Sequence, residues 1–391
     1  MHENHIKVPL GLSQTGVISQ EISPEGPLRV VVGRTTEQET CPRCGQVATK
    51  RHDARRRVKA DAPIGERAVT LVVVRRRFRC FTCRRPFSEP EPICGERRRL
   101  TCRLREQLGQ ACRDRPVEHL AQEFGVSPTT VRRARREVVA RQNERVVAAP
   151  DVLGIDEFSV RKGQRYATGI HDMTGRRVLD VIKGRTQKKV QEALERLAHP
   201  EQIRVVSMDL AGNFRAAVQE VLPDAVIVAD KFHVVKRVNQ AVRQVWRRLL
   251  RGKPKDDPLR KDGALALRAY EQLSLSHRAT LDALLRASPL LHRAHRLKED
   301  FRHWYRRCSA TDARLELSAW RRMVADLPDL PEFAALAGMF ARWQEEILHY
   351  FTYRVTQGFV EGKNNLAKVL ERRAFGYRNV DNLREQLQLA N

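Results

Sequence analysis

Two aspartates follow short apolar runs in the second half of the sequence. Residues 152–155 lead into Asp156, and residues 203–208 lead into Asp209. Short apolar runs predict buried strands, and the carboxyl ends of neighbouring strands in an α/β sheet form the edge where ligands bind. Carboxylates there suit Mg²⁺ or Mn²⁺, and two such ions about 3.5–4 Å apart could activate the attacking oxygen and stabilise the leaving oxygen of a phosphodiester. Taken alone, an aspartate at a strand end is more often a turn residue or a helix cap.

A third carboxylate, Glu361, lies in a segment with helical spacing. The spacing places the polar side chains of this segment on one stripe, formed by Glu361, Asn364, Asn365 and Lys368. The apolar side chains are expected on the other side, towards a core, and are Leu366, Val369 and Leu370. Glu361 is therefore our candidate for the third metal-binding carboxylate.

Two Cys-x-x-Cys pairs stand in the first quarter of the chain. Cys41 and Cys44 form the first pair, Cys80 and Cys83 form the second, and 35 residues separate the two pairs. Four thiolates can hold one tetrahedral Zn²⁺, and a strand-rich insertion, such as the β-branched run at 68–78, could fill a gap longer than zinc ribbons usually have. A redox pair or unrelated buried cysteines are the alternatives, and two matching pairs argue against both. We expect a closed, structural zinc site.

A basic pair of helices is predicted over residues 116–140. The first helix ends at Gly125, and Ser127-Pro128 is a typical start for the second. The dimensions match a helix-turn-helix, and five side chains of the second helix are available to DNA, namely Thr129, Thr130, Arg132, Arg133 and Arg136. Arginine can bond phosphates or read guanine, and the sequence leaves both open. An ordinary solvated pair of helices is the alternative.

These residues require a framework of strands and helices after residue 150. Further strands are predicted over 166–170, 178–182 and 225–229, and helices over 187–197 and up to about 222. The order β-β-β-α-β-α-β-α predicts an α/β domain with mixed strands and helical crossovers. Residues 231–350 are predicted to be almost entirely helical, and the last helix is predicted over about 359–373.

The composition restricts the class of protein. The chain has 391 residues, a formal net charge of +26 and 41% hydrophobic residues, which suits a globular protein of several domains. The positive charge indicates a polyanionic partner, although an arginine-rich composition alone could spread arginine everywhere. Residues 97–145, however, hold 13 arginines and six acidic residues. Neither a secretory signal nor an apolar run of about 20 residues is visible, so we expect a cytoplasmic, nucleoid-associated protein without a membrane partner.

Five stretches together resemble the ISL-three family of insertion-sequence transposases. They are GIDEF at 154–158, SMDL at 207–210, ADKFHVVK at 229–236, EGKNN at 361–365 and RRAFGYRN at 372–379. The paired cysteines, with residues 77–80, resemble the family's N-terminal zinc-binding segment. The resemblance covers nearly the whole chain. A mild departure at Gly362-Lys363 involves no expected metal ligand.

The resemblance implies a multidomain α/β protein with an RNase H-like catalytic domain. Its DDE triad would be Asp156, Asp209 and Glu361, which would bind catalytic Mg²⁺ or Mn²⁺. The expected domains are a β-rich zinc-binding segment at 1–95, a helix-turn-helix at 96–148 and the catalytic domain at 149–391. A large all-helical insertion is expected within the last domain, at about 240–355.

Further residues receive roles by the same resemblance. Asp230 and His233 fit an Asp-x-x-His element of related transposases and would support the site, as would Asn365. The alternative for His233 is that it simply packs under the sheet. Lys368, Arg372 and Arg373 are expected to neutralise DNA phosphates. Two further acids, Glu157 and Asp172, could replace a triad member if the triad is displaced.

The expected function is transposition. The protein would bind the terminal inverted repeats of its element, hydrolyse phosphodiester bonds at the ends with Mg²⁺, and join the 3′-hydroxyls to target DNA. Because two ends must be paired, we expect an oligomer, in the simplest case a homodimer. Two alternatives share most of these features. A DNA-binding regulator would carry a catalytically silent domain of the same fold, and a structure-selective nuclease would cut without joining.

Overall fold

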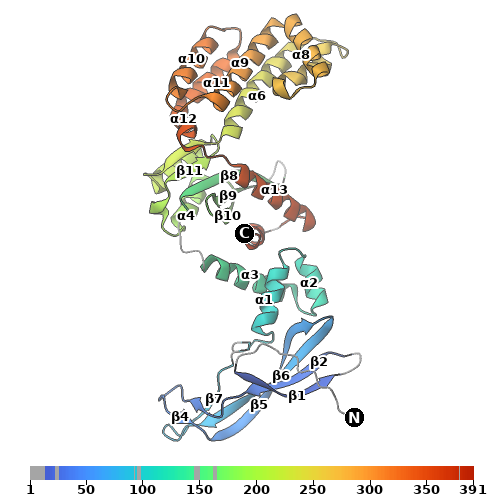
Figure 1. The fold of residues 1–391 in the computed structure, drawn as a ribbon, viewed down its shortest axis with the longest axis vertical. Coiled ribbons are helices and arrows are strands. Elements are labelled where there is room, and N and C mark those ends of the chain that lie inside the picture. The colour runs from blue at the N-terminus through green and yellow to red at the C-terminus, as the bar shows by residue number, and fades with distance from the viewer. Residues whose placement is uncertain are drawn as a thin grey trace. The chain divides into compact units, whose positions relative to one another are not determined.

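The computed structural model describes residues 14–22, 26–91, 93–94, 98–144, 150–161, 165–377 and 379–391. It divides into two compact units, Met1–Arg145 and Val146–Asn391, which are treated separately below (Figure 1). Arg378, which belongs to the last family-like stretch, lies outside the described residues, as do residues 145–149, which include the boundary of the two units. The expected mixture of an N-terminal β-rich segment, an α/β segment and a helical region is confirmed.

The first unit begins with a sheet built around a long hairpin. The strands are β1 (Thr15–Ile22), β2 (Leu28–Arg34), β5 (Arg51–Ile64), β6 (Arg67–Arg79) and β7 (Pro86–Ser88), with the order β1-β2-β6-β5 and β7 on β6. Strand β6 confirms the run predicted at 68–78, whereas β5 was not predicted. Much of β5 is exposed and carries arginines at successive positions, so it lacks the alternation of apolar and polar residues that marks a strand.

Three helices complete the first unit. They are α1 (Cys102–Ala111), α2 (Val117–Glu123) and α3 (Pro128–Glu144). Helix α2 stops before Gly125, whose φ of +61° is the left-handed conformation that glycine adopts without steric cost. The side chain of Ser127 accepts a hydrogen bond from Thr130 N at 3.2 Å, so α3 starts as the sequence predicts. Val131, Ala134 and Val138 are buried on one face of α3.

The second unit contains a mixed five-stranded sheet of order β10-β9-β8-β11-β12. The strands are β8 (Val152–Arg161), β9 (Arg165–Asp172), β10 (Arg177–Lys183), β11 (Val205–Met208) and β12 (Val226–Ala229). Strands β8, β11 and β12 run parallel, while β9 is antiparallel to both β8 and β10. Helix α4 (Gln187–Glu195), the short η1 (Pro200–Gln202) and helix α5 (Gly212–Val221) form the connections, as the predicted element order requires.

One boundary prediction is wrong and concerns Asp156. The sequence predicts that the strand stops before this residue, but β8 continues to Arg161. The reason is that β8 has two neighbours of different length: β11 pairs with it only as far as Ile155, whereas β9, on the other side, pairs with it from Leu153 to Arg161. Asp156 therefore lies inside a strand, at the point where β8 loses its parallel neighbour.

A helical region lies between β12 and the last two helices of the unit. Its elements are α6 (Lys231–Leu249), α7 (Pro258–Asp262), η2 (Gly263–Leu267), η3 (Tyr270–Gln272), α8 (Leu275–Ala287), α9 (Pro289–Arg307), α10 (Ala313–Ala325), α11 (Pro331–Arg342) and α12 (Gln344–Tyr353). Helix α6 leads from the sheet into this region, where α8 to α11 pack together (Figure 1). Its core is aromatic, since the Phe301 ring centroid lies 5.0 Å from that of Trp304 and 5.0 Å from that of Trp320.

Helices α13 (Gly358–Arg373) and α14 (Val380–Leu389) close the fold against β8 to β10. Helix α13 matches the prediction, but α14 follows it, so the predicted last helix is not the last. The rotation of α13 also differs from the prediction. Its buried line is Val360, Asn364, Ala367 and Leu370, while Val369, predicted to face a core, is 55% exposed. Among the described helices, none combines the length and apolar character that crossing a membrane requires.

Candidate active site

Three aspartates form a row at the carboxyl edge of the sheet. Met208 of β11 is in register with Ile155 of β8 on one side and with Ala229 of β12 on the other. Each of these three residues is followed in the chain by an aspartate. The three aspartates are Asp156, Asp209 and Asp230. Strand β11 is buried at every position, so the sheet interior fixes this register. The row brings together two residues predicted as metal ligands and one predicted as supporting.

His233 joins two of these carboxylates. It lies in the first turn of α6, where Asp230 caps the helix by accepting a hydrogen bond from His233 N at 3.3 Å. The His233 Nδ1 lies 2.6 Å from an oxygen of Asp209 and 2.9 Å from an oxygen of Asp230. Partial burial lowers the pKa of His233, but the two carboxylates outweigh that effect and raise it to about 9. The imidazole is therefore charged at neutral pH and contacts the acids rather than packing beneath the sheet.

Asp156 is held by groups from two elements. One oxygen accepts a hydrogen bond from Asn364 Nδ2 at 2.5 Å, and the other accepts one from Glu157 N at 2.8 Å. Burial, followed by the negative charge of Asp209, raises the pKa of Asp156 to about 7. Asn364 was not among the predicted site residues. The sequence feature that could have identified Asn364 is its spacing from Val360 and Ala367, because these three residues lie on one buried face of the helix.

Helix α13 reaches Asp156 because β8 carries a glycine. A β-carbon on Gly154 would lie 2.8 Å from Val360 Cγ2 and 2.9 Å from Met173 Sδ, so any larger residue would force the helix away from the strand. Gln357, just before the helix, donates a hydrogen bond from Nε2 to the carbonyl of Ile155 at 3.3 Å. The close approach places Asn364 against Asp156.

A cavity of about 620 Å³ lies beside this group. Its lining includes Asp156, Phe232, His233, Glu361, Asn364 and Lys368. Ligand atoms of Asp156, Asp209 and His233 lie within 4.8 Å of one another. Glu361 is exposed and lines the same cavity, but among the described residues it is not part of that close group.

The remaining predicted residues near the site lie on α13 or in the sheet. Asn365 is exposed and accepts a hydrogen bond from Lys368 Nζ at 3.3 Å, and Arg372 and Arg373 are exposed in the last turn of the helix. The two acids considered as substitutes have other partners. Glu157 pairs with Arg185 at 3.2 Å, and Asp172 pairs with Arg177 at 2.7 Å.

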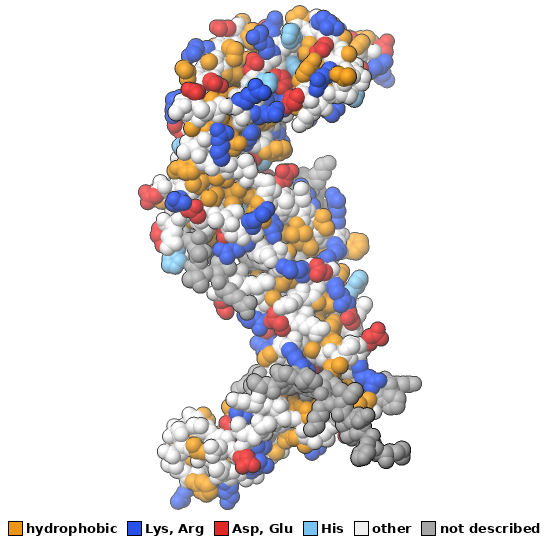
Figure 2. Space-filling view, in the orientation of Figure 1, with side chains coloured by type: hydrophobic (Ala, Val, Ile, Leu, Met, Phe, Trp, Pro, Cys, Tyr) orange, Lys and Arg blue, Asp and Glu red, His pale blue; other side chains and the backbone are white. Residues whose placement is uncertain are grey.

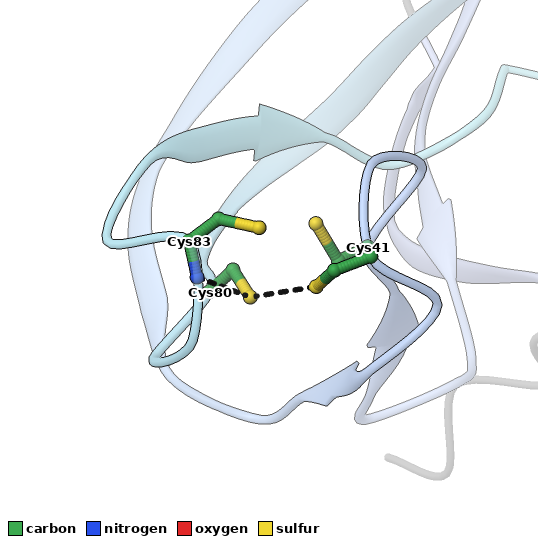
Figure 3. A group of neighbouring side chains, drawn as sticks. Cys41, Cys80 and Cys83 are labelled. Carbon is green, nitrogen blue, oxygen red and sulfur yellow. Dashed lines mark hydrogen bonds between the residues drawn. The ribbon is translucent and has the colours of Figure 1, made fainter.

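The four paired cysteines converge in the first unit. Cys41 and Cys44 lie between β3 (Glu39–Thr40) and β4 (Val47–Ala48), and Cys80 and Cys83 lie between β6 and β7. Their sulfurs are all within 4.8 Å of one another, and Figure 3 shows Cys41, Cys80 and Cys83 directed into one space. Cys44 Sγ lies 3.6 Å from Cys80 Sγ. Tetrahedral coordination at about 2.3 Å requires a sulfur–sulfur spacing of roughly 3.8 Å, so the donor set fits Zn²⁺.

The four clustered thiols affect one another's ionisation. A hydrogen bond from Cys83 N to Cys80 Sγ, 3.4 Å long, lowers the pKa of Cys80 to about 7. The pKa of Cys83 rises to about 12, chiefly because of its contact with Cys44. Thiolates crowded in this way repel one another, and a divalent cation relieves the repulsion. Gly45, with a φ of +72°, makes the tight turn after the first pair.

The predicted DNA-binding side chains lie on or beside the exposed face of α3. Thr129, Arg133 and Arg136 are exposed, and Arg132 pairs with Glu118 at 2.8 Å. Thr130 is partly buried, with its hydroxyl 3.0 Å from that of Ser127. On the face seen in Figure 2, Lys and Arg side chains occur on both units and are interspersed with acidic ones. The predicted contacts are therefore distinguished by their place on α3 rather than by charge alone.

The chain combines a helix-turn-helix, a four-cysteine group and an aspartate row. This combination indicates a DNA-binding protein with a candidate metal-dependent site. A transposase family model matches residues 153–387. The model for the zinc-finger of transposase IS204/IS1001/IS1096/IS1165 matches residues 37–83, and that for the helix-turn-helix domain of transposase family ISL3 matches residues 92–139. The chain belongs to the ISL3 family of transposases, as its resemblance to that family predicts.

Two curated relatives agree with this assignment. The chain is 29% identical to the transposase for insertion sequence element IS1001 of Bordetella parapertussis, over 91% of this chain and 90% of that protein. It is 27% identical to the transposase for insertion sequence element IS1557 of Mycobacterium tuberculosis, over 58% of this chain and 56% of that protein. The zinc-finger match and the converging cysteines support a structural zinc, and the helix-turn-helix match supports DNA binding.

Removing one of the four clustered thiols should release the metal. We expect the purified protein to contain about one zinc per chain, and Cys44→Ser to contain far less, because a site left with three thiolates loses affinity. Cys102→Ser is the matched control, since Cys102 is also exposed but lies outside the group. Elemental analysis measures the metal content. Equal zinc in the wild type and Cys44→Ser would contradict the four-cysteine site.

Proposed function

We propose that the protein is a DDE transposase that cleaves the ends of its insertion sequence with divalent metal ions and joins them to target DNA. The observation that carries the proposal is the close group formed by Asp156, Asp209 and His233, beside a cavity also lined by Glu361. Membership of a transposase family makes DNA the substrate. Binding of the terminal inverted repeats would fall to the helix-turn-helix, assisted by the zinc segment.

We infer that the catalytic domain is RNase H-like. The sheet order β10-β9-β8-β11-β12, with β9 as the antiparallel strand, is what such a fold requires. The domains would then be a zinc-binding segment at 1–95, a helix-turn-helix at 96–148 and a catalytic domain at 149–391. The helical insertion, expected at about 240–355, corresponds to the region from α6 to α12.

The aspartate row suits Mg²⁺ or Mn²⁺. Hard cations prefer carboxylate oxygens, and Asp209 and Asp156 each place such an oxygen within 4.8 Å of the other. Bound ions would activate the attacking oxygen and stabilise the leaving oxygen of the phosphodiester. Asp156 and Asp209 would hold the metal, and Asn364 would fix the orientation of Asp156. Asp230 and His233 would orient Asp209 and balance its charge.

We propose Glu361 as the third metal ligand because of its position on α13. Asn364, three residues further along, contacts Asp156, and residues three apart lie on the same side of a helix, about 5–6 Å from each other. The Glu361 carboxylate lies on the wall of the same cavity. From this position Glu361 would complete the carboxylate set that holds the metal.

The DNA would lie along α13 and across the cavity. Lys368 on the cavity wall and Arg372 and Arg373 in the last turn of α13 would neutralise phosphates, and Asn365 would position Lys368. Because transposition pairs two ends, we also propose a homo-oligomer, in the simplest case a dimer. Its chromosomal substrate would place the protein at the nucleoid in the cytoplasm.

Neutralising a triad carboxylate should abolish catalysis without loss of DNA binding. We expect Asp209→Asn and Glu361→Gln to reduce cleavage of a labelled element end in Mg²⁺ by more than about 100-fold, since even outer residues of metal sites contribute about 10–100-fold. Glu371→Gln is the matched control, because it removes the same charge from α13 outside the cavity lining. Gel shifts test end binding. Full cleavage by Glu361→Gln would remove that residue from the triad, and full cleavage by Asp209→Asn would overturn the proposed mechanism.

The affinity for Mg²⁺ should fall as the pH is lowered through 7. Because the pKa of Asp156 is raised to about 7, this carboxyl keeps its proton below that pH, and metal binding must displace it. We expect about a tenfold loss of affinity per pH unit below 7. Calorimetry in buffers of different ionisation enthalpy measures both the affinity and the released proton. Asp156→Asn should release none, and an affinity independent of pH between about 5.5 and 7 would contradict the expected competition.

Arg133 should contribute to DNA binding through its charge or by reading a base. We expect Arg133→Ala to weaken binding of the terminal repeat and, if Arg133 contacts one phosphate, to reduce the slope of log affinity against log salt by about 0.9. Arg141→Ala is the control, because Arg141 lies on the same helix but pairs with Glu106. Gel shifts over a salt series measure the effect. Equal binding by Arg133→Ala and the wild type at every salt concentration would exclude Arg133 from the interface.

A further inference from the structure

Phe232 is an aromatic side chain exposed beside the aspartate row. It lies in the first turn of α6, next to His233, and it is 59% exposed while lining the cavity. Its ring meets the His233 ring edge to face, with the centroids 5.5 Å apart and an interplanar angle of 89°. Lys236 Nζ lies 6.0 Å from the centroid of the Phe232 ring. The ring is thus linked to the carboxylates through a single imidazole.

Packing within the chain does not account for this side chain. The buried face of α6 is formed by Val234, Val238 and further apolar residues, and Phe232 is not part of it. The preceding Lys231 points inward, with its Nζ 3.3 Å from both the carbonyl of Tyr305 and the hydroxyl of Tyr350. What distinguishes Phe232 from other exposed apolar side chains is its place on the wall of the cavity beside the aspartate row, where a bound substrate could contact it.

We propose that Phe232 is a stacking platform for a nucleobase of the element end, next to the phosphate that is cut. The inference rests on the proposed function. A phosphate held by metal ions bound at Asp156 and Asp209 would place the adjoining sugar and base beside His233 and its neighbouring ring. An aromatic ring stacks on any base, and a base leaves the duplex most readily where the DNA is deformed for chemistry.

The charges around the ring favour a nucleotide over an apolar protein side chain. Lys236 lies beside the ring, and Lys368 lines the same cavity, so cations are available to the phosphates that flank a displaced base. Aromatic side chains interleaved with lysines are typical of surfaces that bind unpaired nucleic acid. An apolar protein side chain would gain from the ring but not from the lysines.

The first experiment compares three full-length variants in single-turnover cleavage of a duplex carrying the terminal repeat. Phe232→Ala removes the ring, Phe232→Leu keeps apolar volume without a π-face, and Phe232→Trp keeps a ring. We expect Phe232→Ala and Phe232→Leu to cleave roughly 5- to 150-fold more slowly than the wild type, and Phe232→Trp to be close to it. Leu315→Ala on α10 is the control for loss of an exposed apolar side chain and should cleave normally.

The second experiment identifies the base by removing it. Abasic sites are introduced one at a time through the nucleotides around the cleavage position, and the wild type and Phe232→Ala are compared on each substrate. At one position the difference between the two proteins should disappear, because the stacking partner is gone. A difference that persists at every position, or normal cleavage by Phe232→Ala, would overturn the proposal. Normal cleavage by Phe232→Leu would assign the ring to packing against protein and would overturn it too. Failure of the wild type to cleave would instead refute the proposed function itself.

Discussion

The crowding of three carboxylates at one sheet edge is the constraint on which the rest of the site depends. Parallel pairing of β8, β11 and β12 puts Asp156, Asp209 and Asp230 in neighbouring register, where their charges repel. Three groups offset this repulsion. The imidazolium of His233 lies beside Asp209 and Asp230, the side-chain amide of Asn364 donates to Asp156, and the first turn of α6 donates to Asp230. Burial, followed by the negative charge of Asp209, nevertheless keeps the pKa of Asp156 raised. Such a site gains free energy by binding a cation.

Two helices bring the compensating groups to the edge, and each is anchored elsewhere. Helix α6 presents His233 from its first turn, while its buried valines tie it into the core of the helical region. Helix α13 presents Asn364 because Gly154 lets it approach β8 closely. The side chains of the site are thus oriented by packing at some distance from it. Glu361, by contrast, is exposed on the cavity wall and is held by no such packing.

The chain separates two kinds of metal chemistry. The first unit gathers four soft thiolates, which suit Zn²⁺ and, as four ligands to a tetrahedral ion, leave no open position. The second unit gathers carboxylate oxygens beside an open cavity, which suits a hard cation that keeps some of its ligands exchangeable. The closed site therefore serves the fold of the DNA-binding unit, and the open one suits chemistry on a phosphodiester.

Local patterns in the sequence determined much of this protein. The Cys-x-x-Cys pairs predict the zinc group, Gly125 with Ser127-Pro128 predicts the helix-turn-helix, and the apolar runs before Asp209 and Asp230 predict the strands that carry them. Each pattern works because its few residues set the local backbone or supply all the ligands. Only the tertiary structure decided which residues meet. The end of β8 depends on how far β9 continues to pair with it after β11 has stopped, and the choice of Asn364 over Asn365 depends on how α13 is rotated on the sheet. Helical spacing defines a stripe, but the packing of distant elements determines which part of that stripe is buried.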